Sequence, residues 1–242
     1  MFCHFCGAKV ADDVRFCTSC GQPLSNPAAP GGPPPPPNVP TPGAVPSAPW
    51  TPPVGIKAQP GRWISEGWAV VSSDIGNYLL ISLIFVLLNG IPFIQGALIA
   101  GFHIFTMKKL MGRRGDVGDL FKGFNFFVHT LVASLLIGIF VFAGTLLCFI
   151  PGLIVAAMYK FTFLFIVDKR MEFWPAMQAS HAVVKNDYFG FTMFLILAFL
   201  VNVLGFLCLV VGLLITVPVT VAAITVAYKE IVGVDPATVD AL

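Results

Sequence analysis

The sequence predicts an all-α polytopic membrane domain, with about six transmembrane helices arranged as three repeated hairpins, behind a small N-terminal zinc ribbon. Three long apolar runs indicate the membrane domain. Residues 75–107, 123–167 and 188–228 span 33, 45 and 41 residues, and Lys160 is their one charged residue. One crossing needs about 20 apolar residues, because a helix rises about 1.5 Å per residue and the bilayer core is about 30 Å thick. Each run is therefore too long for one crossing, and its length suits two crossings that form a helical hairpin.

The overall composition agrees with a membrane protein. The chain is 57% hydrophobic and 11% charged, whereas soluble domains carry about 25% charged residues. Its net charge of +2 gives no electrostatic reason to expect a nucleic-acid partner. The first residues lack the basic and apolar regions of a secretory signal, so we expect the N-terminus to stay in the cytosol.

Residues 1–24 contain two closely spaced cysteine pairs, Cys3 with Cys6 and Cys17 with Cys20, and a glycine follows each pair. Four thiolates in this pattern match tetrahedral Zn²⁺ coordination, and metal binding lets so short a segment fold without a core. The four cysteines fill the coordination shell, so we expect a structural zinc ion and no ligand role for His4. Redox or disulfide pairs are the alternative, which a cytosolic location disfavours.

Residues 25–60 are dominated by proline, glycine, alanine and serine, and Lys57 is their only charged residue. Such a segment cannot bury a core, so the sequence predicts a disordered linker with polyproline II character. A proline-rich ligand for an aromatic-lined groove is the alternative. The segment lacks the flanking basic residues that such ligands often carry, and we therefore expect a spacer.

The membrane domain is predicted to cover residues 61–234, and a short tail at 235–242 follows it. Its first residues place Trp63 and Trp68 near one helical face. Tryptophan is common at membrane boundaries, so we expect an amphipathic helix in the interface ahead of the first crossing.

Each hairpin is expected to turn where glycine or proline interrupts the apolar run, near Gly90, Gly152 and Gly212. Proline disfavours helix at the preceding residue, so Ile91 and Ile150 are expected to be helix ends. The first run allows two helices of only about 16 residues. We expect two short crossings there, and a re-entrant pair is the alternative.

An internal repeat is predicted from two similarities. The Ile91-Pro92 and Ile150-Pro151 pairs lie 59 residues apart, and AVVSSD at residues 69–74 resembles AVVKND at residues 182–187. Similarity at fixed spacing indicates duplicated units. Chance resemblance among leucine-rich segments is the alternative.

The basic residues predict the orientation. None lies near a hairpin turn, and the loops between the runs carry most of the positive charge: Lys108, Lys109, Arg113, Arg114, Lys122, Lys169, Arg170 and Lys185. With three hairpins, these loops share one side of the membrane. The positive-inside rule then puts them and both termini in the cytosol.

Polar residues inside the apolar runs are candidates for an intramembrane site. Lys160 is costly at that depth and is either functional or extended toward the headgroups. His103, Asn89 and Asn202 are further candidates; a buried histidine bonded to a neighbouring helix and interhelical amide bonds are the alternatives. Small residues at Gly96–Ala100 and Gly152–Ala156 predict close helix packing. Cys148 and Cys208 are expected to be buried small side chains.

No H-E-x-x-H, G-x-S-x-G or phosphate-binding loop motif occurs, and no apolar run holds a pair of carboxylates. We therefore expect no enzymatic activity. The predicted function is an integral membrane protein, surrounded by lipid, that presents the ribbon to a protein partner. A transporter or lipid-handling protein with a regulatory ribbon is the alternative. An oligomer is compatible with the sequence.

The pattern FCHFCGAKVADDVRFCTSCGQPL resembles the zinc-ribbon module that precedes linkers and membrane domains in many uncharacterised bacterial and archaeal proteins. His4 and Thr18-Ser19 depart from it, where members often have proline. The stretch CFIPGLIVAAMYKFTFLFIVDKRMEFWPAMQASHAVVKND is similar to polytopic domains of unknown function, which are akin to the membrane region of some glycerophosphodiester phosphodiesterases. The catalytic domain of those enzymes has no counterpart here. The resemblance implies a multi-pass protein of a prokaryotic cell membrane and no established activity.

Overall fold

A computed structural model describes residues 51, 54–91, 93–208 and 211–242. These residues belong to one compact unit, Val45–Leu242. The predicted zinc ribbon and most of the predicted linker lie outside the described residues.

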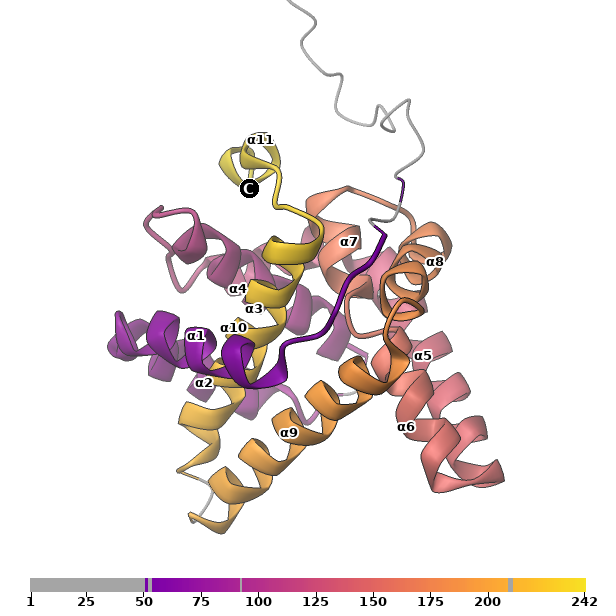
Figure 1. The fold of residues 1–242 in the computed structure, drawn as a ribbon. Helices are drawn as coiled ribbons and strands as arrows, with labels where there is room; N and C mark the ends of the chain where they lie inside the picture. The colour runs from indigo at the N-terminus through magenta and orange to yellow at the C-terminus, as the bar shows by residue number, and fades with distance from the viewer. Residues whose placement is uncertain (1–50, 52–53, 92, 209–210) are drawn as a thin grey trace, which may run out of the picture. The chain divides into compact units, whose positions relative to one another are not determined.

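The described residues form helices and no strands (Figure 1). In chain order, the helices are α1 (Pro60–Ser72), α2 (Ile75–Leu88), α3 (Gln95–Leu110), α4 (Asp119–Lys122), the 3₁₀ helix η1 (Gly123–Phe126), α5 (Phe127–Leu147), α6 (Phe149–Met158), α7 (Thr162–Asp168), α8 (Phe173–Val184), α9 (Tyr188–Leu207), α10 (Leu213–Ile231) and α11 (Pro236–Asp240).

Four helical segments in this part of the chain are long and apolar enough to cross a membrane: Asp119–Leu147, Ile150–Asp168, Tyr188–Leu207 and Leu213–Ile231. A fifth is added if α1 and α2, which meet at an angle of 102°, count as one span. The chain therefore has the helices of a membrane protein, and the structure supports four to five spans rather than the predicted six.

The first hairpin accounts for the difference in number. Helices α2 and α3 have 14 and 16 residues, so they are about 21 and 24 Å long, and the bilayer core is about 30 Å thick. The apolar run is long enough for longer helices, but the segment between the end of α2 at Leu88 and the start of α3 at Gln95 uses part of it. Six crossings and the internal repeat remain predictions.

Helices α3 and α10 form the centre of the domain. An unbroken run of α3, from Ala100 to Met107, is buried, and so is the second half of α10, from Pro218 to Tyr228. Helix α3 contacts α2, α4, α5, α7 and α10. A helix that is apolar all round is expected at such a position. Helix α5 differs, because only Thr130 and Ala133 of it are buried.

Glycines permit close approach of these helices. A Cβ atom at Gly67 of α1 would lie 2.7 Å from the Ala223 amide nitrogen of α10, and one at Gly96 of α3 would lie 2.6 Å from the Thr130 carbonyl oxygen. A Cβ at Gly152 would overlap Thr145, so α6 packs closely on α5 there. The close packing predicted at Gly96 and Gly152 is therefore present.

Helix α1 differs from the predicted interfacial helix. Trp63 is 0% exposed and donates a hydrogen bond from Nε1 to the Glu230 carboxylate at 2.7 Å, whereas Trp68 is 48% exposed. The Trp63 ring packs on Phe191 and Phe194 of α9. The apolar face of α1 therefore contacts protein, because Gly67 brings the helix directly onto α10.

The second hairpin turns earlier than predicted. Its bend is at Cys148, which has extended backbone, and Ile150 and Gly152 lie inside α6. Pro151 is tolerated there because first-turn residues have no intrahelical acceptor for an amide hydrogen. Cys148 and Cys208 are exposed, contrary to the expected burial, because each directly follows the last residue of a helix.

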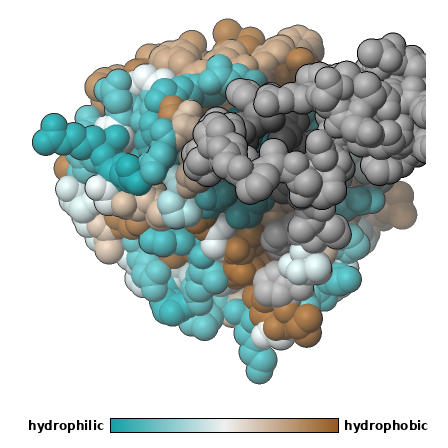
Figure 2. Space-filling view, turned by 90° about the horizontal axis from the view of Figure 1, so that it is seen from above, coloured by the Kyte–Doolittle hydropathy of each residue, from teal (hydrophilic) through white to brown (hydrophobic). Residues whose placement is uncertain are grey.

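Polar side chains gather at one end of the domain. Figure 2 shows the end where α11 lies, with hydrophilic side chains over much of that face and hydrophobic ones along parts of its rim. The start of α1 is attached near this end, because the Ala58 amide donates a hydrogen bond to Asp187 Oδ2 at 3.1 Å. Asp187 also caps α9 by accepting from the Gly190 amide at 2.9 Å. This end is called the charged end below.

Candidate functional site

The four predicted zinc ligands, Cys3, Cys6, Cys17 and Cys20, lie outside the described residues. Their donor set of four thiolates fits Zn²⁺, which prefers sulfur and nitrogen ligands in a tetrahedron. No group of three or more His, Cys, Asp or Glu residues that could hold a metal ion is found within the described ranges.

His103 is a buried residue of α3 that bonds to α10. Its Nδ1 lies 2.8 Å from Thr225 Oγ1, and the Thr225 hydroxyl donates to the Val221 carbonyl oxygen at 2.8 Å. A hydroxyl has one hydrogen, so Nδ1–H of the neutral ring donates to Thr225, which leaves Nε2 as an acceptor. His103 thus joins the two central helices.

The two candidate asparagines lie apart from His103. Asn202 of α9 donates to the Ala198 carbonyl oxygen at 2.9 Å and to Thr220 Oγ1 of α10 at 3.3 Å, so it links the helices of the third hairpin. Asn89 follows α2 at the turn of the first hairpin, and its side-chain oxygen is buried without a hydrogen-bond partner.

Lys160 lies at a break between α6 and α7, which together make one candidate span of 19 residues. Ser180 of α8 maintains the break: its hydroxyl donates to the Met158 carbonyl oxygen at 2.7 Å and accepts from the Phe161 amide at 3.2 Å. Insertion of a side chain into the backbone ladder is a known cause of such interruptions.

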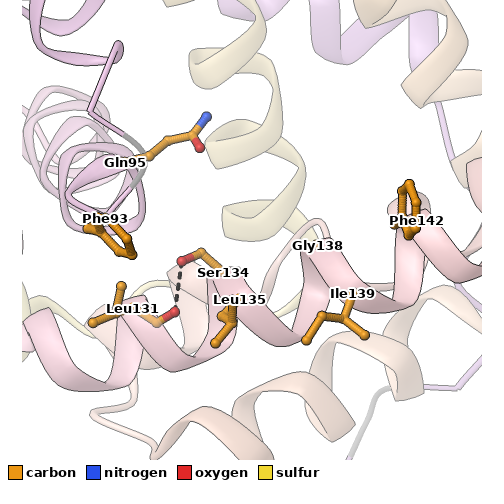
Figure 3. Close-up of a pocket in the computed structure, with 8 residues that line it drawn as sticks. All are labelled: Phe93, Gln95, Leu131, Ser134, Leu135, Gly138, Ile139 and Phe142. Atoms are coloured by element: carbon orange, nitrogen blue, oxygen red, sulfur yellow. Dashed lines mark hydrogen bonds between the residues drawn. The ribbon is translucent and has the colours of Figure 1, made fainter.

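The four candidates do not converge on one pocket. A pocket of about 390 Å³ lies between the turn of the first hairpin and α5, and it is lined mainly by apolar residues (Figure 3): Phe93, Gln95, Leu131, Ser134, Leu135, Gly138, Ile139 and Phe142. None of the four candidates lines it.

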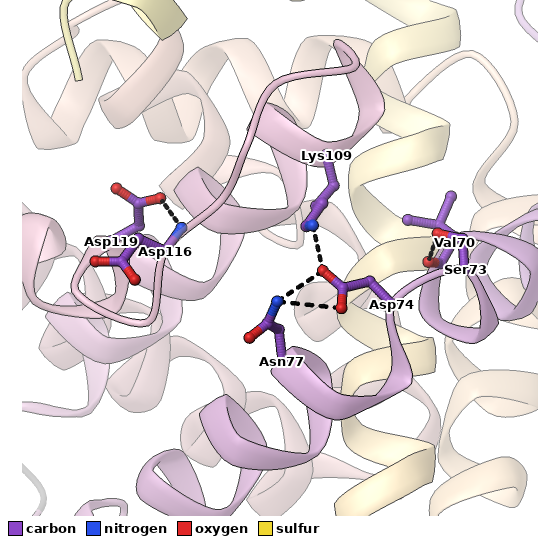
Figure 4. Close-up of polar contacts among 7 residues, drawn as sticks. All are labelled: Val70, Ser73, Asp74, Asn77, Lys109, Asp116 and Asp119. Carbon is purple, nitrogen blue, oxygen red and sulfur yellow. Dashed lines mark hydrogen bonds and ion pairs between the residues drawn. The ribbon is translucent and has the colours of Figure 1, made fainter.

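A network of ion pairs at the charged end was not predicted from the sequence. Asp74 pairs with Lys109 of α3 and accepts from Asn77 (Figure 4). The hydrogen bond from Lys109 is the main reason that the pKa of the Asp74 carboxyl lies below its usual range. Asp119 is almost fully buried and lies 2.7 Å from both Lys108 and Lys122.

Asp168 at the end of α7 is the most buried acid of this network. Its carboxylate accepts hydrogen bonds from the Tyr228 hydroxyl and the Asp235 amide, both at 2.9 Å, and lies 3.0 Å from Lys169. It thereby connects α7, α10 and the segment that leads into α11. The sequence feature that could have predicted this site is an acidic residue, Asp168, directly after an apolar run and directly before Lys169.

The comparisons with known proteins assign only the N-terminus. Residues 2–24 match the family model of the zinc-ribbon domain. No curated protein and no solved structure matches the chain. The chain thus carries a zinc-ribbon domain ahead of helices that could span a membrane, while the resemblance of the membrane domain remains a prediction.

The full-length protein, purified with a reductant, is expected to contain about one zinc ion per chain, because four thiolates complete one tetrahedral site. The double variant Cys3→Ser, Cys6→Ser should contain none by inductively coupled plasma mass spectrometry. The variant Cys148→Ser, Cys208→Ser also loses two thiols and should keep its zinc. Equal zinc content in the two double variants would contradict the assigned ligands.

Proposed function

We propose that this chain is an integral membrane protein without catalytic activity, which presents a tethered zinc ribbon to a protein partner in the cytosol. The observation that carries the proposal is a zinc-ribbon match at residues 2–24 ahead of a domain with four to five candidate spans. A proline-rich segment at residues 25–60 separates the two.

The chemistry of the ribbon supports binding rather than catalysis. Four cysteine ligands leave no open coordination position on zinc, which a catalytic site requires. The charges of the ribbon are balanced, with Lys9 and Arg15 against Asp12 and Asp13. A balanced surface favours a protein partner over nucleic acid, whose phosphates select basic surfaces.

The buried polar residues of the domain support a structural role for its helices. His103 and Asn202 use their hydrogen bonds to join neighbouring helices, and neither lines the pocket beside α5. A transporter is expected to gather such residues around one central site. Their separation therefore favours a domain that anchors the ribbon.

The tether gives this arrangement a physical advantage. A ribbon attached near the membrane meets a membrane-bound partner at a raised effective concentration, without a fixed orientation. The positive-inside rule, applied to the basic residues of the loops, supports a cytosolic position for the charged end. We therefore assign both termini to the cytosolic side of a cell membrane.

Crosslinking in native membranes tests the proposal. A photoreactive group placed in the ribbon of the full-length protein is expected to give discrete protein adducts, and the variant Cys3→Ser, Cys6→Ser should lose them because its ribbon cannot fold. The variant Cys148→Ser, Cys208→Ser is the matched control and should keep the adducts. Adducts that persist in the ribbon variant, or that are absent from the unmodified protein, would refute a ribbon-dependent partner.

A further inference from the structure

The first hairpin covers only the beginning of α5. A Cβ atom at Gly96 of α3 would lie 2.6 Å from the Thr130 carbonyl oxygen and 3.2 Å from Ser134 Oγ, so the start of α3 packs against the first turns of α5. Helix α5 then continues to Leu147, about 20 Å beyond Ser134 at 1.5 Å per residue. Every residue of α5 after Ala133 is at least partly exposed, so the hairpin leaves most of this helix uncovered.

The pocket of about 390 Å³ lies along α5 where the hairpin ends (Figure 3). Its lining extends on α5 from Leu131 to Phe142, a length of about 16 Å. Figure 3 shows Phe93 of the hairpin turn near Leu131 and Phe142 at the opposite end. Gly138 lies between them, and a Cβ atom there would have no neighbouring atom within 4 Å. The pocket is therefore elongated, and a glycine keeps its middle open.

The pocket belongs to the surface that α5 presents to lipid. The segment that contains α5 is the least buried of the four candidate spans. Gln95 and Ser134 are the polar members of the lining, and the Ser134 hydroxyl already donates to a carbonyl oxygen of its own helix at 2.9 Å. The exposed Val128 and Leu146 of α5 continue the apolar surface on either side. An occupant of this pocket is therefore apolar and comes from the membrane.

The dimensions of the pocket distinguish between possible occupants. A volume of about 390 Å³ over about 16 Å corresponds to a mean cross-section of about 24 Å². A helix is about 10–12 Å wide, with a cross-section of about 80–110 Å², so a helix of a second copy is too wide to enter. A single hydrocarbon chain is narrow enough, because its carbon atoms contact apolar neighbours at about 3.5–4.0 Å. The length also matches the roughly 15 Å of hydrocarbon in one leaflet.

We propose that the pocket between the turn of the first hairpin and α5 binds one acyl chain of a membrane phospholipid. An empty pocket leaves its lining atoms without dispersion partners, and the acyl chain supplies them. Glycine is unfavourable inside a helix, and Gly138 packs against no neighbouring helix of the described residues. Room for the acyl chain gives this glycine a role. The zinc ribbon has no part in the site, so the site can fail while the proposed function stands.

Photolabelling of the full-length protein in nanodiscs tests the site. The probe is phosphatidylglycerol with a diazirine in one acyl chain, and peptide mass spectrometry measures the adducts on each residue. Ile139 and Phe142 of the pocket are compared with Leu200 and Phe199 of α9, whose side chains are similarly exposed. Adducts on the pocket pair are expected to exceed those on the α9 pair at least about threefold, because a few additional close carbon contacts give such a preference.

The variant Gly138→Leu fills the pocket and should bring the two adduct yields to equality. Gly76→Leu is the matched control, because a Cβ atom at Gly76 of α2 also has no neighbour within 4 Å and Gly76 does not line the pocket. Equal yields on the two pairs in the unmodified protein, or a ratio that Gly138→Leu leaves unchanged, would overturn the site. Disulfide-linked dimers of Ile139→Cys, made without Cys148 and Cys208, together with low yields on the pocket pair would also overturn it, since a second copy would then cover the pocket.

Discussion

A membrane-impermeant maleimide added to the outside of intact cells is expected to label Cys148 and Cys208. Both cysteines are exposed, the first at the bend between α5 and α6 and the second directly after α9. No charged residue lies near either turn. With the basic loops in the cytosol, both turns face the opposite side, so their labelling should be close to complete, while the zinc-bound cysteines stay unlabelled. A gel shift of the labelled chain measures the result.

Position-specific controls make this experiment decisive. Cys148→Ser and Cys208→Ser should each lose one of the two labels. Arg114→Cys, made in a chain that lacks both native thiols, reports on the charged end and should be labelled only after permeabilisation. The orientation is reversed if Cys148 and Cys208 react only after permeabilisation and Arg114→Cys reacts before it. If neither native thiol reacts in permeabilised cells, the turns do not reach the far surface.

Gly101→Leu is expected to prevent stable folding of the membrane domain. A Cβ atom at Gly101 of α3 would lie 2.5 Å from the Leu120 carbonyl carbon, which is backbone and cannot move aside by changing rotamer. Overpacking a close-packed site typically costs about 1–3 kcal/mol, and a clash with backbone belongs at or above the top of that range. The measurement is the melting temperature and the yield of monodisperse protein in detergent.

The control for this variant uses a glycine with free space around it. A Cβ atom at Gly138 of α5 would have no neighbouring atom within 4 Å, so Gly138→Leu should keep nearly normal yield and melting temperature. The close approach of α3 to the segment before α5 would be refuted if Gly101→Leu melted within a few degrees of Gly138→Leu. Gly101→Ala should have a melting temperature and a yield between those of Gly101→Leu and the unmodified protein, because it adds the clashing Cβ atom without the rest of the leucine side chain.

The helices of the second and third hairpins could be predicted from the sequence because the signal is local. The runs at 123–167 and 188–228 are long and almost free of charge, and they contain most or all of α5, α6, α9 and α10. The first run did not reveal that α2 and α3 have only 14 and 16 residues, fewer than the roughly 20 of a typical crossing. Apolar composition is the same whether a helix is surrounded by lipid or, like α3, by other helices.

Contacts between distant residues could not be predicted. Trp63 fits an interfacial helix by its spacing, but its neighbour is Glu230 of α10. His103 and Thr225 are 122 residues apart in the sequence, and Asp168 and Tyr228 are 60 apart. No local pattern encodes such pairs. The zinc ligands are the opposite case, because their whole signal is the spacing within 24 residues, and the family match covers that segment.

The hydrogen bond between Ala58 and Asp187 has a consequence for where a partner can be found. It fixes the origin of the tether at the corner between α8 and α9. The 33 residues from Ser25 to Lys57 span at most about 120 Å when fully extended. With the proposed cytosolic orientation, the ribbon would be confined to a hemisphere of that radius over the inner leaflet, and a protein that it recruits would have to dock inside that hemisphere.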